Sequence, residues 1–194
     1  MAILAAAAQS FFNDGYAATS IEQIAAAAGV SKVTIYNNFN DKRGLFAAAV
    51  EQECEKIRSA FKLEDISQGT LRQRLTAIGE AMTSFLARPE MVQFERRIAA
   101  ETEHEPNIGE AFLMAGPHRV KAAFARLLAA MHEAGEVDIA DTDLAAEQFA
   151  SMCKGMGDLD RRFGRPTDEA RDRERIAGAV KVFCAAYACP SQQS

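Results

Sequence analysis

The sequence predicts an all-α protein, and three observations support this fold class. Alanine, the best helix former, is the most frequent residue, and only 12 glycines and 5 prolines interrupt the 194 residues. Apolar residues recur every three or four positions along most of the chain. We find no alternating run of Val, Ile and Thr bounded by turn residues, which a β-strand would require. We expect about nine helices.

The first helix is expected near the start of the chain and should end at Asn13-Asp14-Gly15. Its apolar positions form one face: Leu4, Ala8, Phe11 and Phe12. Tyr16 follows the turn and can pack beneath the helix. This helix would brace the two helices that come next.

Residues 20 to 28 and 31 to 39 have the pattern of a helix-turn-helix. Ser20 and Ser31 are good N-caps, and Gly29 lets the chain turn sharply between the two helices. The first of these helices has apolar residues at i, i+3, i+4 and i+7, beginning at Ile21. Helix, glycine turn, helix is the layout of many DNA-binding domains, although an ordinary helical hairpin has the same pattern.

The second of these helices is expected to expose side chains that suit a DNA duplex. Ile35, with Val30 and Phe39, can hold it against the first helix. The outward-facing side chains are then Lys32, Val33, Thr34, Tyr36, Asn37 and Asn38. A lysine can donate to guanine O6 or N7, a valine can contact a thymine methyl, and hydroxyls and amides can donate to phosphates.

The N-terminal part resembles the DNA-binding domain of the TetR family over residues 3 to 50. The matching stretches are Thr19-Ser20-Ile21, Ile24-Ala25, Ala28-Gly29-Val30-Ser31, Thr34-Ile35-Tyr36, Phe39, Asp41-Lys42 and Leu45-Phe46. The resemblance implies that Lys32, Val33 and Thr34 read bases of an operator. It also implies that phosphates are held by Thr19, Tyr36, Asn38 and Lys42.

A fourth helix should begin at the N-cap Asp41 and run for about twenty residues, some 30 Å. Its apolar positions are Phe46, Val50, Cys54, Ile57 and Phe61. Residues 62 to 69 read as a connection between domains. We therefore expect a DNA-binding domain over residues 1 to 50, joined by the fourth helix to a helical effector-binding and dimerisation domain over residues 51 to 194.

The middle of the chain is expected to hold four further helices and to supply an effector pocket. The helices cover about residues 71 to 86, 90 to 103, 108 to 114 and 118 to 134. Large adaptable apolar side chains with a few polar ones are typical of small-molecule pockets, although a plain helical core has the same composition. The candidates are Met82, Phe85, Phe94, Arg96, His118, Phe124, Gln148, Phe149 and Met152. Glu110-Ala111-Phe112 and Ala115-Gly116-Pro117 resemble the C-terminal domain of AefR-like TetR regulators.

The last two helices have apolar residues at an average spacing of 3.5, which favours bundle-like packing. In TetR relatives two such helices from each of two chains form a four-helix bundle about a two-fold axis. The resemblance therefore implies a homodimer, whereas the spacing alone equally allows packing within one chain. The predicted interface residues are Phe149, Met156, Ile176, Val180, Phe183 and Tyr187.

The charge distribution is compatible with DNA binding but not strongly basic. The net charge is −5, and within residues 1 to 50 three basic residues balance three acidic ones. Nucleic-acid binding needs a local patch rather than a basic total. TetR relatives usually carry a basic arm before the first helix, whereas this sequence begins almost inside that helix at Met1-Ala2-Ile3-Leu4.

The sequence has no recognisable catalytic or metal-binding motif. We find no Gly-rich phosphate loop, no HExxH and no G-x-S-x-G. Pro106 and Gly116-Pro117 separate the three histidines, His104, His118 and His132, so their even spacing predicts no metal site. We expect no enzyme activity, no cofactor and no metal. Four cysteines without CxxC spacing predict reduced thiols in a cytoplasmic protein, and no apolar run is long enough to span a membrane.

These observations predict a cytoplasmic, homodimeric DNA-binding regulator, a repressor released from its operator by a small-molecule effector. The alternative is a helical small-molecule-binding protein whose helix-turn-helix no longer binds DNA.

Overall fold

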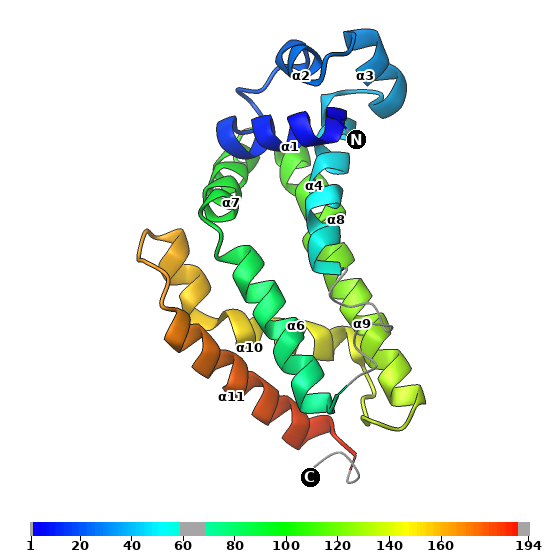
Figure 1. Cartoon of the computed structure of the whole chain (residues 1–194), viewed down its shortest axis with the longest axis vertical. Helices are drawn as coiled ribbons and strands as arrows, with labels where there is room; N and C mark the ends of the chain where they lie inside the picture. Colours follow the sequence, from blue (N-terminus) through cyan, green and yellow to red (C-terminus); the bar gives the residue numbers. More distant parts are fainter. Residues whose placement is uncertain (1, 59–68, 190–194) are drawn as a thin grey trace. The chain divides into compact units, whose positions relative to one another are not determined.

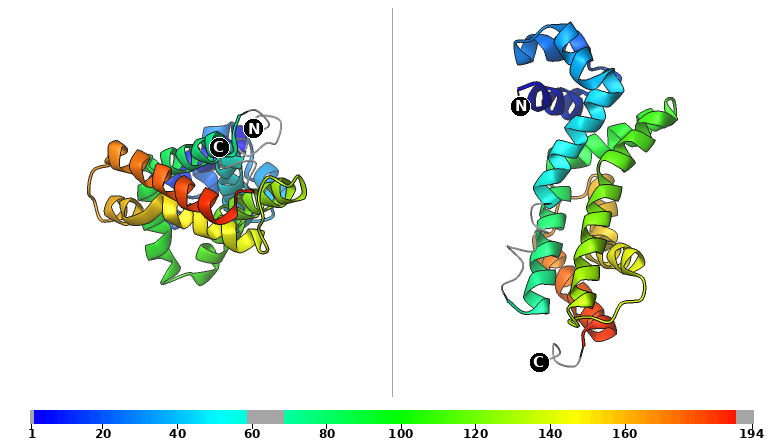
Figure 2. Two further views of the ribbon diagram at one scale, coloured as in Figure 1. Left: turned by 90° about the horizontal axis from the view of Figure 1, so that it is seen from below. Right: turned by 90° about the vertical axis from the view of Figure 1, so that its right-hand side faces the viewer.

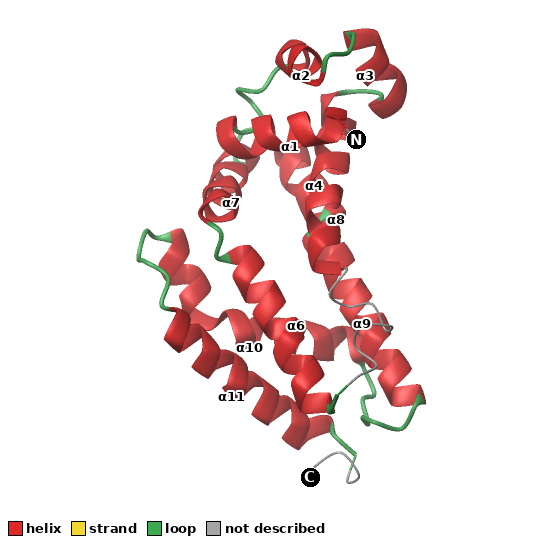
Figure 3. Ribbon diagram, in the orientation of Figure 1, coloured by secondary structure: helices red, strands yellow, loops and turns green. Residues whose placement is uncertain are grey.

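The computed structural model describes residues 2 to 58 and 69 to 189. In these ranges the regular structure is α-helical, with one isolated bridge between Val137 and Ala188 and no β-strand (Figure 3). The predicted fold class is therefore confirmed. The predicted end of the fourth helix near Phe61 and the connection over residues 62 to 68 lie outside the described residues.

The chain packs as two compact units. Unit 1 comprises residues Met1–Lys56 and Arg88–Arg119, and unit 2 comprises Ile57–Ala87 and Val120–Ser194. The helices of unit 1 are α1 (Ala2–Asp14), α2 (Ile21–Ala28), α3 (Lys32–Phe39), most of α4 (Lys42–Arg58), α7 (Pro89–Thr102) and α8 (Pro106–Ala115). Unit 2 contains α6 (Leu71–Leu86), most of α9 (Pro117–Glu133), α10 (Thr142–Arg162) and α11 (Glu169–Tyr187).

Aromatic side chains join the helices of unit 1. The Phe12 and Phe94 rings are 4.1 Å apart and link α1 to α7, and Phe46 of α4 meets Phe11 edge-on at 5.3 Å. Figure 1 shows α1 between the α2–α3 pair and α7. Residues 88 to 119 thus pack with the first 56 residues, so the units of packing differ from a division at residue 50. The functional division at that residue stays a prediction.

In unit 2, α10 and α11 lie side by side and pack on α6 (Figures 1 and 2). A row of aromatic rings runs through this core. Phe149 lies 5.4 Å from both Phe124 and Phe183, and Phe183 lies 4.8 Å from Tyr187.

This packing revises the residues assigned to the dimer interface. Phe149, Ile176, Val180 and Phe183 are buried within their own chain, because the stripe with the 3.5-residue spacing faces the neighbouring helices of unit 2. Their side chains are therefore not available to a partner subunit. Of the other two predicted residues, Met156 is exposed, whereas Tyr187 is half-buried and donates a hydrogen bond from its hydroxyl to Gln148 at 3.1 Å.

Helix α10 is kinked at Gly155, where φ is 46° and ψ is −150°. Only glycine adopts this conformation readily. The side chain of Arg175 lies against the glycine, since a Cβ added there would be 2.7 Å from Arg175 Cδ. Arg175 also pairs with Asp172, and Asp172 accepts a 2.9 Å hydrogen bond from Arg161. A buried network of charges therefore joins α10 to α11 beside the kink.

The four cysteines are free thiols. Cys54, Cys153 and Cys184 are buried and Cys189 is partly exposed. Burial raises the pKa of Cys153 to about 12, which keeps it a neutral and unreactive thiol at physiological pH. None of the described helices is both long and apolar enough to cross a bilayer.

Candidate nucleic-acid interface

The caps expected from the sequence form the helix-turn-helix. The Ser20 hydroxyl accepts from the Gln23 N–H at 3.1 Å, and the Gln23 side chain accepts from the Ser20 N–H at 2.9 Å, a complete capping box at the start of α2. Gly29 ends α2 in the left-handed conformation with φ of 67°. The Ser31 hydroxyl then accepts from the Thr34 N–H at 3.1 Å and starts α3.

Helix α3 presents most of its side chains to solvent. Ile35 is fully buried and holds the helix on unit 1, while Val33 is 65 % and Tyr36 46 % exposed. Lys32, Asn37 and Asn38 are also exposed, and Thr34 is half-buried. The Asn38 amide donates to the Thr34 carbonyl at 2.7 Å, which fixes its position along the helix. The exposed valine and tyrosine on so short a helix suit a surface that contacts a partner.

Thr19 lies in the turn between α1 and α2, and the side chain of Lys42, the first residue of α4, reaches the same turn. Thr19 is buried, and its hydroxyl donates to the Gly15 carbonyl at 2.7 Å, so we revise its predicted contact with phosphate to a structural role. The Lys42 ammonium lies 4.3 Å above the Tyr16 ring and donates to the Ala17 carbonyl at 3.4 Å. Burial lowers the pKa of Lys42. Lys42 remains partly exposed and therefore stays a candidate for phosphate contact.

Two side chains of α7 hold the same turn, and sequence reasoning did not find them. Arg97 donates from Nη1 to the Phe12 carbonyl at 2.9 Å and also to the Asn13 carbonyl, which satisfies the C-terminal end of α1. Glu101, one turn later, accepts from the Ala17 N–H at 3.1 Å. The Arg96-Arg97 pair stands out in the sequence, but nothing local shows that it reaches α1.

The side chain of Glu101 from α7 lies close to Gly15, and we expect Gly15→Ala to be more destabilising than a glycine substitution in open space. Its φ is +92°, and an added Cβ would lie 2.6 Å from Glu101 Oε1. The left-handed backbone costs an alanine about 1–2 kcal/mol. Loss of the hydrogen bond to the Glu101 carboxylate adds about 1.5–3 kcal/mol.

Gly164→Ala is the matched control, because φ there is +89° and an added Cβ meets nothing within 4 Å. Chemical denaturation of both variants measures the difference. Equal losses of unfolding free energy would show that the Glu101 contact contributes nothing.

Lys32 of α3 forms an ion pair with Glu22, which the sequence did not predict. Its Nζ lies 2.7 Å from Glu22 Oε1 on the first turn of α2, and both side chains are more than half exposed. The ion pair links the first turn of α2 to the first turn of α3.

The predicted effector residues are divided between the two units. Phe94, Arg96 and His118 belong to unit 1. Met82, Phe85, Phe124, Gln148, Phe149 and Met152 belong to unit 2. Arg96, His118 and Gln148 are exposed, whereas the phenylalanines and Met82 are buried.

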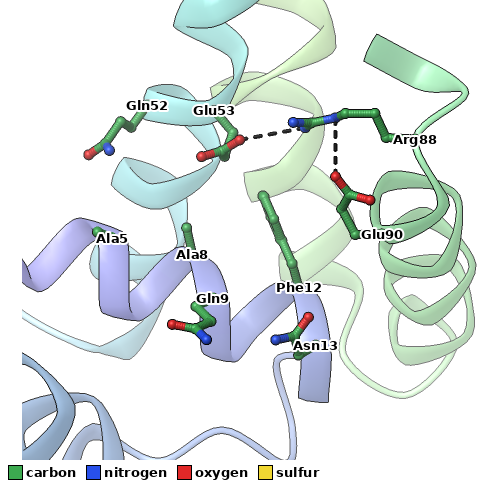
Figure 4. Close-up of a pocket in the computed structure, with 9 residues that line it drawn as sticks. All are labelled: Ala5, Ala8, Gln9, Phe12, Asn13, Gln52, Glu53, Arg88 and Glu90. Atoms are coloured by element: carbon green, nitrogen blue, oxygen red, sulfur yellow. Dashed lines mark ion pairs between the residues drawn. The ribbon is translucent and has the colours of Figure 1, made fainter. Parts of the chain in front are cut away.

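Unit 1 contains a cavity of about 390 Å³ beside α1, in the size range of small-molecule pockets. Ala5, Ala8 and Phe12 form its apolar part (Figure 4). Arg88 lies at its edge, 3.5 Å from Glu53 and 3.6 Å from Glu90.

A metal centre would require converging ligands. Across the part of the chain that the structure describes, no three His, Cys, Asp or Glu side chains gather as such a centre would need. His132 Nδ1 instead accepts from the Ile139 N–H at 3.2 Å, in the turn after α9.

Comparison with known proteins identifies the family. Residues 3–49 match the family model of bacterial regulatory proteins of the tetR family, and residues 73–189 match that of the AefR-like transcriptional repressor C-terminal domain. A putative TetR-family transcriptional regulator from Mesorhizobium loti superposes with a TM-score of 0.80 at 27 % identity, covering 97 % of this chain and 96 % of that one. The flavonoid-responsive regulator FrrA superposes with a TM-score of 0.76 at 30 % identity and the same coverage.

A third relative is similar over less than half of this chain. The HTH-type transcriptional activator FasR of Mycolicibacterium smegmatis is 33 % identical over 84 residues, which are 43 % of this chain and 38 % of that protein. The two family models together cover most of the sequence. The chain belongs to the TetR family of DNA-binding transcriptional regulators.

Proposed function

We propose that this protein is a homodimeric repressor that a small-molecule effector releases from its operator. The observation that carries the proposal is the exposed face of α3, where Val33 and Tyr36 extend into solvent from a helix held by the buried Ile35. Lys32, Val33 and Thr34 would read base edges in the major groove. Tyr36, Asn37, Asn38 and Lys42 would contact the backbone or flanking bases.

A two-fold dimer would place two copies of α3 in successive major grooves, about 34–36 Å apart or a multiple of that distance. Effector binding would change the separation of the two copies. A coupling of about 1–3 kcal/mol would weaken operator binding 5–150-fold.

The dimer surface that we propose lies on the exposed apolar side of the last two helices. Met156, Leu159 and Phe163 follow each other at i, i+3 and i+7 around the end of α10, and all three are exposed. Val182 is an exposed apolar residue of α11. Apolar side chains grouped in this way on a surface indicate a protein contact.

The effector site and the sign of regulation are also proposals. The predicted pocket residues of unit 2 and the cavity beside α1 are the two places to test, with flavonoids as the first effector class because FrrA responds to them. FasR is an activator, so an experiment on this protein must distinguish repression from activation.

Selection of bound fragments from random DNA, with and without candidate effectors, tests the proposal. A recovered palindrome with two half-sites, bound less tightly at higher salt, supports it, since phosphate contacts make affinity fall with ionic strength. The second candidate function, a ligand-binding protein without DNA affinity, is favoured by the pairing of Lys32 with Glu22. If no sequence is enriched and an effector still binds the protein, that second function is established.

We expect Val33→Ala to relax base preference at one or two operator positions, because the lost methyls would no longer contact a thymine. The expected cost at those positions is about 1–3 kcal/mol. Tyr36→Phe removes only a hydroxyl that would donate to phosphate, so it should weaken all sequences alike. Binding of each variant to a set of single-base operator variants distinguishes the two effects; a uniform loss for Val33→Ala would place Val33 away from the bases.

A further inference from the structure

The recognition surface of α3 carries a single cation, and α2 supplies a carboxylate that neutralises it. Lys32 is the only lysine or arginine between Ser31 and Asp41. Its Nζ donates to Glu22 Oε1 at 2.7 Å. This hydrogen bond lowers the pKa of Glu22 and raises the pKa of Lys32, because it stabilises the charged form of each group.

The ion pair has little to contribute to folding. The side chains are 53 % and 61 % exposed, and exposed ion pairs add little to stability because solvent screens them. The α2–α3 arrangement already rests on the two serine caps, Gly29 and the buried Ile35. The ion pair therefore acts mainly on the DNA that approaches α3, not on the stability of the fold.

A carboxylate on a DNA-facing surface has restricted chemistry. It repels phosphates and can only accept hydrogen bonds. In the major groove the available donors are the amino groups of cytosine N4 and adenine N6. A lysine, in contrast, binds any phosphate as well as guanine O6 and N7, so on its own it favours DNA of every sequence.

We infer that Glu22 is a specificity-determining residue, which accepts from a cytosine or adenine amino group beside the base that Lys32 contacts and keeps Lys32 from random phosphates. This inference rests on the proposed DNA-binding function. On a matching sequence both members of the pair find base partners. On other sequences Glu22 remains opposite Lys32, and this pair adds no net attraction for the backbone.

The test compares Glu22→Gln with the wild type on two duplexes, the selected operator and a random sequence of equal length. Glutamine keeps the length of the side chain and removes its charge. Fluorescence anisotropy titrations at several salt concentrations should show tighter binding to random DNA, with a salt dependence steeper by about one phosphate contact. The ratio of operator to random affinity should fall about 10-fold. Fragment selection with the variant should also lose preference at one position.

Glu110→Gln is the control, because Glu110 is an exposed carboxylate on α8 of the same unit and is removed in the same way. It should leave the ratio and the selected sequence unchanged. A wild-type ratio and an unaltered selected sequence in Glu22→Gln would overturn the inference while the DNA-binding function stands. If the wild type selects no sequence at all, the proposed function fails and this inference fails with it.

Discussion

Asp172→Ala is expected to lower the free energy of unfolding by about 3–5 kcal/mol, the usual cost of removing one member of a buried ion pair. The Asp172 carboxylate and the Arg161 guanidinium are both about 95 % buried, at 6 % and 5 % exposure, and are 2.9 Å apart. Asp172 also pairs with Arg175 beside the α10 kink. Without the carboxylate, two guanidinium groups would face the same site.

Urea denaturation followed by circular dichroism measures this loss. Glu169→Ala, on the first turn of the same helix, removes an exposed carboxylate that lies 3.7 Å from Arg173, and should change stability by no more than about 1 kcal/mol. The double variant Arg161→Met, Asp172→Leu should recover much of the loss, because apolar residues often replace a buried ion pair without penalty. Similar stability of Asp172→Ala and Glu169→Ala would mean that the network contributes little.

The sequence predicts the elements of the candidate interface well because their determinants are local. Ser20, Gly29 and Ser31 act on backbone groups within a few residues of themselves, so the caps follow from residue type and spacing. The outward face of α3 follows equally from the position of Ile35. An ordinary helical hairpin would not explain why Val33, an apolar residue, is exposed on this helix.

The spacing of an apolar stripe does not reveal which helices the stripe contacts. Ile176, Val180 and Phe183 repeat at a spacing that suits helix packing, but the spacing is the same whether the facing helix belongs to the same chain or to a second one. In this protein the facing helices are α10 and α6 of the same chain. The sequence therefore predicted the stripe correctly and could not decide which helices it contacts.

Long-range contacts escaped prediction for a related reason. Arg97 reaches the Phe12 carbonyl from 85 residues further along the chain, and nothing near either residue indicates the other. The kink of α10 is similar, because Gly155 lies within a strongly periodic helix and the residue packed against it, Arg175, comes from α11.

The dimer surface proposed at the end of α10 can be tested by mutation. Met156→Arg combined with Leu159→Arg should give monomers that keep their helical content. Both side chains are exposed, at 63 % and 46 %, so arginine can replace them without entering the core. A charge in place of the buried Phe183 would instead destabilise the subunit, and loss of the dimer in that variant would say nothing about an interface. Two arginines in an apolar contact would have to lose their hydration when the dimer forms, and this penalty opposes association.

Monomers should bind the operator far less tightly than the dimer, because a second half-site held in place raises avidity by about 10²–10⁴ without new contacts. Sedimentation velocity gives the oligomeric state, and anisotropy titrations of operator and single half-site duplexes give the affinities. The variant should bind the half-site as the wild type does and lose the advantage of the full operator. Met114→Arg, a substitution of the same type at a 58 % exposed methionine on α8, is the control and should remain dimeric. A dimeric double variant would exclude the end of α10 from the interface, whereas two monomeric variants would show that added charge alone, at either surface, prevents association.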